Sequence, residues 1–180
     1  MDTLRRTITM PQTPAHHAIV SSDHLSTQSV EMSEFEFGLI MASHAFSRWI
    51  VRCMSASGMP ELGSLDILVL HSVNHRHRPK RAADICLVFN IEDSHTVTYA
   101  LKKLLKLGLV ATEKRGKETY FLTTEEGRTL CEKYAAVRRD CLLDAVQTLG
   151  FAGEEMGATS TLLRALSGIY DQASRAAASL

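Results

Sequence analysis

The sequence predicts a mainly α-helical protein with one small β-hairpin, in which long helices flank a central mixed module. Apolar residues recur at helical spacing before residue 60 and again after residue 124. Between them, short helical patterns give way to two β-prone runs around a glycine. The chain has 180 residues and 45% hydrophobic composition, which suits one compact domain with an added oligomerisation region.

The first long helix is expected to begin at Ser33, because Ser33 and Glu36 have the spacing of a capping box. Residues 1–31 are rich in Ser, Thr, His, Gln and Pro, and predict an arm with little structure of its own. Gly58 and Pro60 end the helix. Two apolar stripes on it indicate burial against a partner as well as its own core. They are Leu39, Ala42, Phe46, Trp49, Cys53 and Ala56, and Ile40, Ile50 and Met54.

The central region predicts two short helices, a turn, a longer helix and a hairpin. Ser64 is the expected cap of the first helix, and Asp93 or Ser94 that of the longest. Gly116 marks the hairpin tip. The second short helix offers Ala83, Ile85, Leu87 and Val88 to the core. The expected elements are helices over residues 65–73, 80–89 and 94–107, a polar loop over 74–79, a turn over 90–93, and strands over 109–112 and 119–122.

A long helix is expected from Thr124, with Gly150, Gly153 and Gly157 breaking the chain before a last helix. The last helix has the spacing of a coiled-coil seam. The two stripes are Leu130, Tyr134, Val137, Cys141 and Ala145, and Leu162, Leu166, Ile169, Ala173, Ala176 and Leu180. The chain is thus divided into a flexible arm (1–31), an N-terminal dimerisation helix (32–60), a winged helix-turn-helix domain (61–123) and C-terminal dimerisation helices (124–180).

The charge distribution is uneven although the formal net charge is zero. Residues 71–117 contain ten basic and four acidic residues, so this segment carries +6 and the remainder −6. A basic module within an acidic chain is typical of a nucleic-acid contact surface. An ordinary solvated face is the alternative, and the helix-turn-helix pattern in the same segment argues against it.

The helix over 94–107 has one apolar and one polar face. With Val97 directed to the core, steps of about 100° per residue place Leu101 and Leu104 on the same side. The N-terminal polar side chains would reach base edges, and the lysines and the basic hairpin tip would contact phosphates or a narrow minor groove. The predicted DNA-binding residues are Ser94, His95, Thr96, Thr98, Tyr99, Lys102, Lys103, Lys106, Lys114, Arg115 and Lys117.

Four segments of the chain match a known family pattern: Ala82-Ala83-Asp84-Ile85, Thr96-Val97-Thr98, Leu104 to Val110, and Leu122-Thr123-Thr124-Glu125-Glu126-Gly127-Arg128. Through these motifs the chain resembles the MarR family of winged-helix transcription regulators over roughly residues 35 to 178. The resemblance implies a triangular homodimer on a palindromic operator, often regulated by a small aromatic ligand or by oxidation. Tyr99 stands where the family commonly has Arg, the turn before Ser94 is one residue longer, and the hairpin lacks the family's Asp-x-Arg pattern.

Two further groups of residues, a histidine cluster and an aromatic group near Cys53, are each consistent with more than one role. His71, His75 and His77 could hold a metal, but no Cys or acid completes the set and neighbouring bases would repel a cation, so we favour a polar loop or phosphate contact. Phe46, Trp49 and Cys53 could line an effector pocket, with core packing favoured over that role. Cys53 could be a redox sensor, although its apolar stripe favours an inert thiol.

Other function classes find little support. The four cysteines show no CxxC pairing, so buried reduced thiols are expected. No catalytic motif is visible, and we expect neither an enzyme nor a cofactor. No apolar run approaches the roughly 18 residues of a membrane span and no signal peptide is evident, so we expect a cytoplasmic protein.

The sequence therefore predicts a homodimeric, sequence-specific transcription regulator whose partners are double-stranded DNA, a second copy and a small-molecule effector. The alternative is a winged-helix protein-interaction dimer that does not recognise a DNA sequence. The lysine row at Lys102, Lys103 and Lys106 favours DNA, because a protein interface would need more apolar or aromatic anchors.

Overall fold

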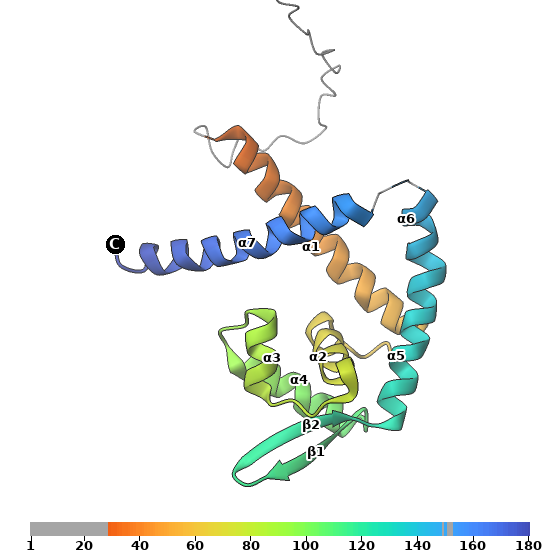
Figure 1. The fold of residues 1–180 in the computed structure, drawn as a ribbon. Coiled ribbons are helices and arrows are strands. Elements are labelled where there is room, and N and C mark those ends of the chain that lie inside the picture. Colours follow the sequence, from red (N-terminus) through yellow and green to blue (C-terminus); the bar gives the residue numbers. More distant parts are fainter. Residues whose placement is uncertain (1–28, 149, 151–152) are drawn as a thin grey trace, which may run out of the picture. The chain divides into compact units, whose positions relative to one another are not determined.

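The computed structural model describes residues 29–148, 150 and 153–180, so the predicted arm lies almost entirely outside the described residues. The mainly α fold with one hairpin is confirmed. Within the described residues, the chain divides into two compact units, one that ends at Phe46 and one that begins at Ser47. In chain order the elements are α1 (Val30–Ala56), α2 (Ser64–Asn74), the 3-10 turn η1 (His75–His77), α3 (Ala82–Phe89), α4 (Ser94–Lys106), β1 (Val110–Arg115), β2 (Glu118–Thr123), α5 (Glu125–Arg138), the π-helical segment η2 (Arg139–Leu143), α6 (Asp144–Thr148) and α7 (Gly153–Ala177) (Figure 1).

The hydrophobic core lies in the second unit, where the end of α1 packs with α2, α4 and α5. Its largest side chains are fully buried. Burying an aliphatic side chain of this size stabilises a fold by about 1.5–3 kcal/mol. The central members are Met54, Ile67, Leu70, Ile85, Leu101 and Leu104.

Two predicted helix caps, Ser33 and Ser64, were wrong. α1 begins at Val30, and Ser33 lies inside it, donating its hydroxyl to the Ser29 carbonyl at 3.0 Å instead of capping the helix. Ser64 is the first residue of α2 and not its cap. The cap position belongs to Gly63, whose N–H donates to the Asp66 carboxylate at 2.9 Å. An acid in the first turn also suits the positive end of the helix dipole.

The predicted contribution of α3 to the core was largely wrong. Ile85 is the residue of this helix that is buried, whereas Leu87 is 84% and Val88 67% exposed. An eight-residue helix has about two turns, so one narrow face contacts the core. That face carries Ile85 with Phe89, one turn later. The helix also starts at Ala82 and not at residue 80, because the backbone of residue 80 pairs with β2 in an isolated bridge.

The hairpin is confirmed, and its strands run further toward the tip than expected. β1 and β2 pair antiparallel from Val110 opposite Thr123 to Arg115 opposite Glu118. Gly116 at the tip has φ +62°, a left-handed conformation that glycine adopts without steric cost. The two strands project as one arm from the helical body (Figure 1).

A tight junction joins the hairpin to α5. The Thr124 hydroxyl caps α5 by accepting the Gly127 N–H at 3.1 Å, and donates to the Gly108 carbonyl at 2.7 Å. Gly127 packs so closely that a Cβ atom there would overlap the Leu109 carbonyl oxygen and lie 2.7 Å from Thr123 Cγ2. This explains the glycine inside the helix.

The segment after α5 differs from the prediction in two respects. The helix passes into the π-helical segment η2 before α6, so the apolar stripe rotates, and Cys141 and Ala145 are exposed. Gly153 begins α7 and Gly157 lies inside it, so neither breaks the chain.

Replacing Gly127 with Ala should destabilise the protein by about 2 kcal/mol or more, because the added methyl group meets backbone atoms that cannot move aside. Gly157→Ala in α7 is the matched control, since nothing lies within 4 Å of a Cβ there, and it should stabilise by about 0.5–1 kcal/mol. Urea unfolding followed by circular dichroism measures both. Equal effects of the two substitutions would refute the close-packing explanation.

Candidate nucleic-acid interface

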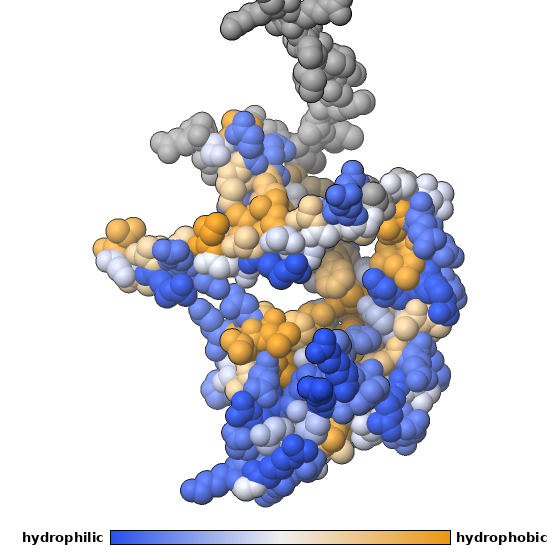
Figure 2. Space-filling model, viewed as in Figure 1, coloured by the Kyte–Doolittle hydropathy of each residue, from blue (hydrophilic) through white to orange (hydrophobic). Residues whose placement is uncertain are grey.

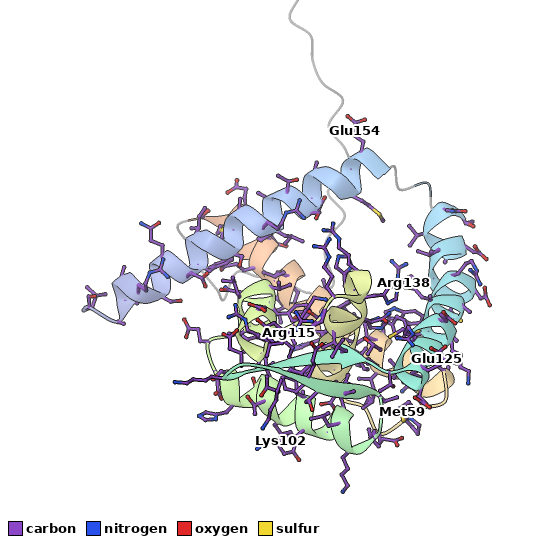
Figure 3. The ribbon with its side chains drawn as sticks, turned by 60° about the horizontal axis from the view of Figure 1, so that its bottom comes forward. Met59, Lys102, Arg115, Glu125, Arg138 and Glu154 are labelled. Carbon is purple, nitrogen blue, oxygen red and sulfur yellow. The ribbon has the colours of Figure 1, made fainter. Side chains whose placement is uncertain are left out.

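Helix α4 presents one buried and one polar face, as the sequence predicts. Val97, Ala100, Leu101 and Leu104 are at most 1% exposed, whereas Tyr99 is 72% exposed. His95, Lys102 and Lys106 are exposed on the same outer side. Figure 3 shows Lys102 extending outward from α4. The core packing therefore fixes which side chains face away from the domain.

The N-terminus of α4 is capped by the Asp93 carboxylate, which accepts the His95 N–H at 2.9 Å. The hydroxyls that follow donate to the helix backbone: Thr96 to the Asp93 carbonyl at 2.7 Å and Thr98 to the Ser94 carbonyl at 3.0 Å. Their oxygen lone pairs remain able to accept hydrogen bonds. An open hollow of about 470 Å³ lies beside this end of the helix. It is lined by Leu65, Asp66, Asp93, His95, Thr96, Tyr99 and Ala100.

Lys103 differs from its two neighbouring lysines. Its ammonium group lies 2.6 Å from the Asp66 carboxylate and 2.6 Å from the Glu61 carbonyl oxygen. The side chain of Asp66 is only 10% exposed. Lys102 and Lys106 have no hydrogen-bond or ion-pair partner among the described residues. Lys103 thus ties α4 to the start of α2, while the other two lysines stay available.

The hairpin tip combines one fixed and two available cations. The Arg115 guanidinium forms two bonds with Glu113, at 2.7 and 3.1 Å, and lies 4.9 Å from the centre of the Tyr120 ring. Glu113 and Arg115 have the spacing of the Asp-x-Arg pattern that the hairpin lacks, with Glu in place of Asp. Lys114 and Lys117 are exposed and have no partner among the described residues.

An arginine clamp joins the hairpin to the start of α3. The Arg81 guanidinium lies 2.8 Å from Asp84 and 2.7 Å from Glu118, and Glu118 also accepts the Tyr120 hydroxyl at 2.9 Å. These hydrogen bonds from Arg81 lower the pKa of both carboxyl groups. Because the pKa values fall on folding, the clamp is formed at neutral pH and its stabilisation is lost as pH falls through the lowered values.

Sequence reasoning missed this clamp. The Arg81–Asp84 spacing could have indicated a local ion pair. Nothing in the sequence joins residue 81 to Glu118, which lies 37 positions later.

Comparisons with known proteins agree with this geometry. Residues 62–127 match the family model of a winged helix DNA-binding domain. AbfR of Staphylococcus epidermidis has a TM-score of 0.62 at 18% identity, covering 78% of this chain and 92% of its own. The chain has the MarR fold. Staphylococcus aureus MarR in complex with salicylate and kanamycin has a TM-score of 0.62 at 16% identity, covering 85% of this chain and 99% of its own.

CouR from Rhodococcus jostii RHA1 bound to p-coumaroyl-CoA is also similar, with a TM-score of 0.59 at 14% identity, covering 73% of this chain and 90% of its own. A search of the curated proteins gave no match. No helix in the described residues is both long and apolar enough to span a membrane.

Within the MarR fold, the residues predicted for an effector pocket have different environments. Cys53 is 1% exposed, its thiol lies 3.6 Å from the Tyr134 carbonyl oxygen, and burial raises its pKa, which disfavours the reactive thiolate. Trp49 is half-buried against the core, and Phe46 is 53% exposed. None of the three lines the hollow beside the N-terminus of α4.

The remaining cysteines and the three histidines are dispersed. Cys131 is buried as expected, whereas Cys86 is half-buried and Cys141 exposed, which corrects the expectation of four buried thiols. His71 packs edge-on against Tyr134, with ring centres 4.5 Å apart. The other two histidines lie in the exposed turn η1, and no group of three or more His, Cys, Asp or Glu within the described residues could hold a metal.

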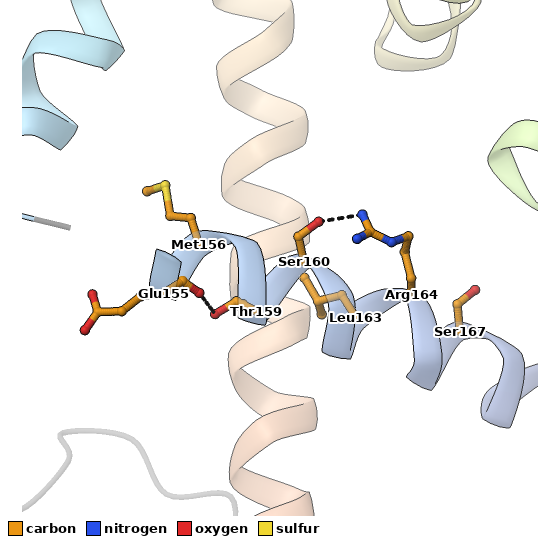
Figure 4. A pocket seen from close by; sticks show the side chains of 7 residues that line it. All are labelled: Glu155, Met156, Thr159, Ser160, Leu163, Arg164 and Ser167. Atoms are coloured by element: carbon orange, nitrogen blue, oxygen red, sulfur yellow. Dashed lines mark hydrogen bonds between the residues drawn. The ribbon is translucent and has the colours of Figure 1, made fainter. Parts of the chain in front are cut away.

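An open hollow follows one face of α7 (Figure 4). Met156 and Leu163 form its apolar part, and Arg164 donates to the Ser160 hydroxyl at 2.7 Å along its edge. No residue of this 25-residue helix is buried.

Lys103→Met should destabilise the protein by about 2 kcal/mol, because it leaves the nearly buried Asp66 carboxylate without its cation. Lys102→Met, on the exposed side of the same helix, should change stability by less than about 0.5 kcal/mol. Chemical denaturation measures both changes. If Lys102→Met is the more damaging substitution, the two roles have been assigned the wrong way round.

Proposed function

We propose that this protein is a transcription regulator that binds a palindromic DNA operator as a homodimer. The observation that carries the proposal is the exposed polar and basic face of α4, held rigidly by a fully buried opposite face. The match of residues 62–127 to a winged helix DNA-binding domain supports it. A helix of this kind enters the major groove with its N-terminal side chains toward the bases.

Each part of this surface has its own task in the proposal. His95 and Tyr99 recognise base edges through hydrogen bonds of their imidazole and phenol groups. The hydroxyl oxygens of Ser94, Thr96 and Thr98 accept hydrogen bonds from donor groups on the bases. Contacts to the DNA backbone come from the available lysines and set affinity and orientation. These are Lys102 and Lys106 on α4 and Lys114 and Lys117 on the hairpin, with Arg115 directed by Glu113.

Lys103 receives a different role from the one predicted. Because it is bonded to Asp66 and Glu61, it positions α4 on α2 instead of contacting a phosphate.

Homodimerisation is supported by helices that expose apolar side chains. On α7, Leu162 is 50% and Ile169 58% exposed, and Figure 2 shows apolar surface along this helix. In α1, Ile40 and Met41 are 46% and 55% exposed. Helices of this kind are stable when a second copy covers them. A two-fold dimer places its recognition helices about one DNA turn apart, at roughly 34–36 Å.

Control by a small aromatic ligand is a further part of the proposal. Staphylococcus aureus MarR is in complex with salicylate and kanamycin, and CouR is bound to p-coumaroyl-CoA. Salicylate and the p-coumaroyl group each carry an aromatic ring. Oxidation at Cys53 is disfavoured by the burial that raises its pKa.

A protein-interaction module is the second candidate, and one observation favours it. Leu87 and Val88 on α3 are 84% and 67% exposed, so the winged-helix domain has an apolar patch that a protein partner could cover. The basic surface on α4 and the hairpin tip still argues for DNA.

Lys102→Ala should weaken binding to any duplex and reduce the salt dependence, because one phosphate contact is lost in each protomer of the dimer. The slope of log K against log salt should become shallower by about 1.8, which is about 0.9 for each protomer. Fluorescence anisotropy with a random-sequence duplex, at several salt concentrations, measures it. Lys133→Ala, an exposed lysine on α5, is the control and should leave the slope unchanged. Identical slopes for wild type and Lys102→Ala would refute the assigned face.

Ile169→Glu should shift the protein from dimer to monomer, because it places a charge within the apolar stripe of α7. Sedimentation velocity should show a dissociation constant raised at least about tenfold, the equivalent of about 1.4 kcal/mol. Ser174→Glu, on another side of the same helix, should leave assembly unchanged. A wild-type monomer, or equal effects of both variants, would refute this interface.

A further inference from the structure

We propose that a small cavity at the base of the hairpin binds a phosphate-like oxyanion. The cavity lies within the second unit, apart from the outward face of α4. The end of α2, the turn after it, the end of β2 and the start of α5 together form its wall. It is lined by Val73, His77, Arg78, Leu122, Thr123 and Arg128.

The size of the cavity suits a small anion. Its volume is about 60 Å³. A single buried water needs roughly 10–15 Å³, so the space is several times larger than one water requires. An organic effector with an aromatic ring would not fit, because binding sites for drug-sized ligands measure about 300–1,000 Å³.

The charged side chains that line the cavity, Arg78 and Arg128, are both basic. Arg78 has no hydrogen-bond or ion-pair partner among the described residues. Arg128 donates to the Thr123 carbonyl at 3.1 Å and is paired with Glu125, the one carboxylate in the described part of the chain that is bonded to a lining residue. Lys80 adds a further cation beside the same turn, where its ammonium lies 2.7 Å from the His75 carbonyl. Positive charge therefore exceeds negative charge around the cavity.

A buried hydroxyl in the wall lacks a partner. Within the described residues, Thr123 Oγ1 is buried and forms no hydrogen bond. Leaving such a group unpaired is unfavourable, and a valine of nearly the same shape would avoid the loss. Thr123 lines the cavity, and a change of its χ1 rotamer would let the hydroxyl donate a hydrogen bond to an oxyanion there, alongside the hydrogen bonds from the arginines.

The turn that carries two of the lining residues has an unfavourable backbone. Arg76 and His77 have φ values of +60° and +48°, a left-handed conformation that side chains with a Cβ rarely adopt. Arg78, which lines the cavity, directly follows these two residues. Strained residues of this kind persist where the surrounding structure fixes them, and they cluster at binding sites.

Thermal unfolding of the full chain in phosphate and in chloride, at equal ionic strength, tests the proposal without DNA. Phosphate should raise the melting temperature of the wild type in a saturable way, because a ligand of the folded state stabilises it. Thr123→Val should abolish this increment and be no less stable than the wild type in chloride. Arg78→Gln should weaken phosphate binding at least about tenfold in a calorimetric titration.

Arg76→Gln is the matched control, since Arg76 shares the turn but does not line the cavity, and it should keep the phosphate response. Equal increments in all four proteins, or none in the wild type, would overturn the proposal. Because this readout needs no DNA, failure of the proposed operator binding would leave it intact.

Binding to a random-sequence duplex distinguishes the two sources of the oxyanion. A free anion predicts that Arg78→Gln leaves DNA affinity unchanged in phosphate-free buffer. A DNA backbone phosphate predicts that Arg78→Gln weakens DNA binding and that inorganic phosphate competes with the duplex. Either result, together with the phosphate response of the wild type, supports an oxyanion site.

Discussion

The burial of one face of α4 is the constraint on which the rest of the structure depends. Val97, Leu101 and Leu104 are completely enclosed, so the helix cannot rotate without exposing them. The Lys103–Asp66 ion pair fixes the same helix to the start of α2. Apolar packing and one nearly buried ion pair thus select which polar side chains face outward. The candidate interface follows from the core and is not an independent feature of the surface.

Two local contacts join the hairpin to this core. The Arg81 clamp connects β2 to the start of α3 through Glu118. At the other end of β2, the missing side chain of Gly127 lets α5 begin against the Leu109 backbone. Recognition helix and hairpin are therefore parts of one packed body. A surface with fixed spacing between its cations can match the regular spacing of DNA phosphates.

Helix faces that follow from periodicity were predicted correctly from the sequence, whereas ion pairs between residues far apart in the sequence were not. The face of α4 was predictable because thirteen residues give a full helical pattern, whereas α3 is too short to show which apolar side chains face inward, and Leu87 was misplaced. Lys103 was grouped with its neighbours because its partner Asp66 lies 37 positions away. Ser33 had the spacing of a cap, but the helix pattern continues before it. Contacts between side chains that are distant in the sequence were therefore the main features that sequence reasoning did not predict.

In the proposed two-fold dimer, the outward face of α4 recognises a DNA sequence. Selection of bound duplexes from a random pool, at two salt concentrations, tests it most directly. Such a dimer should select a two-fold palindrome whose half-sites are centred about 10 base pairs apart, and its binding to that palindrome should persist at the higher salt. Retention of unrelated sequences that disappears at the higher salt would contradict it, because backbone contacts alone behave in that way.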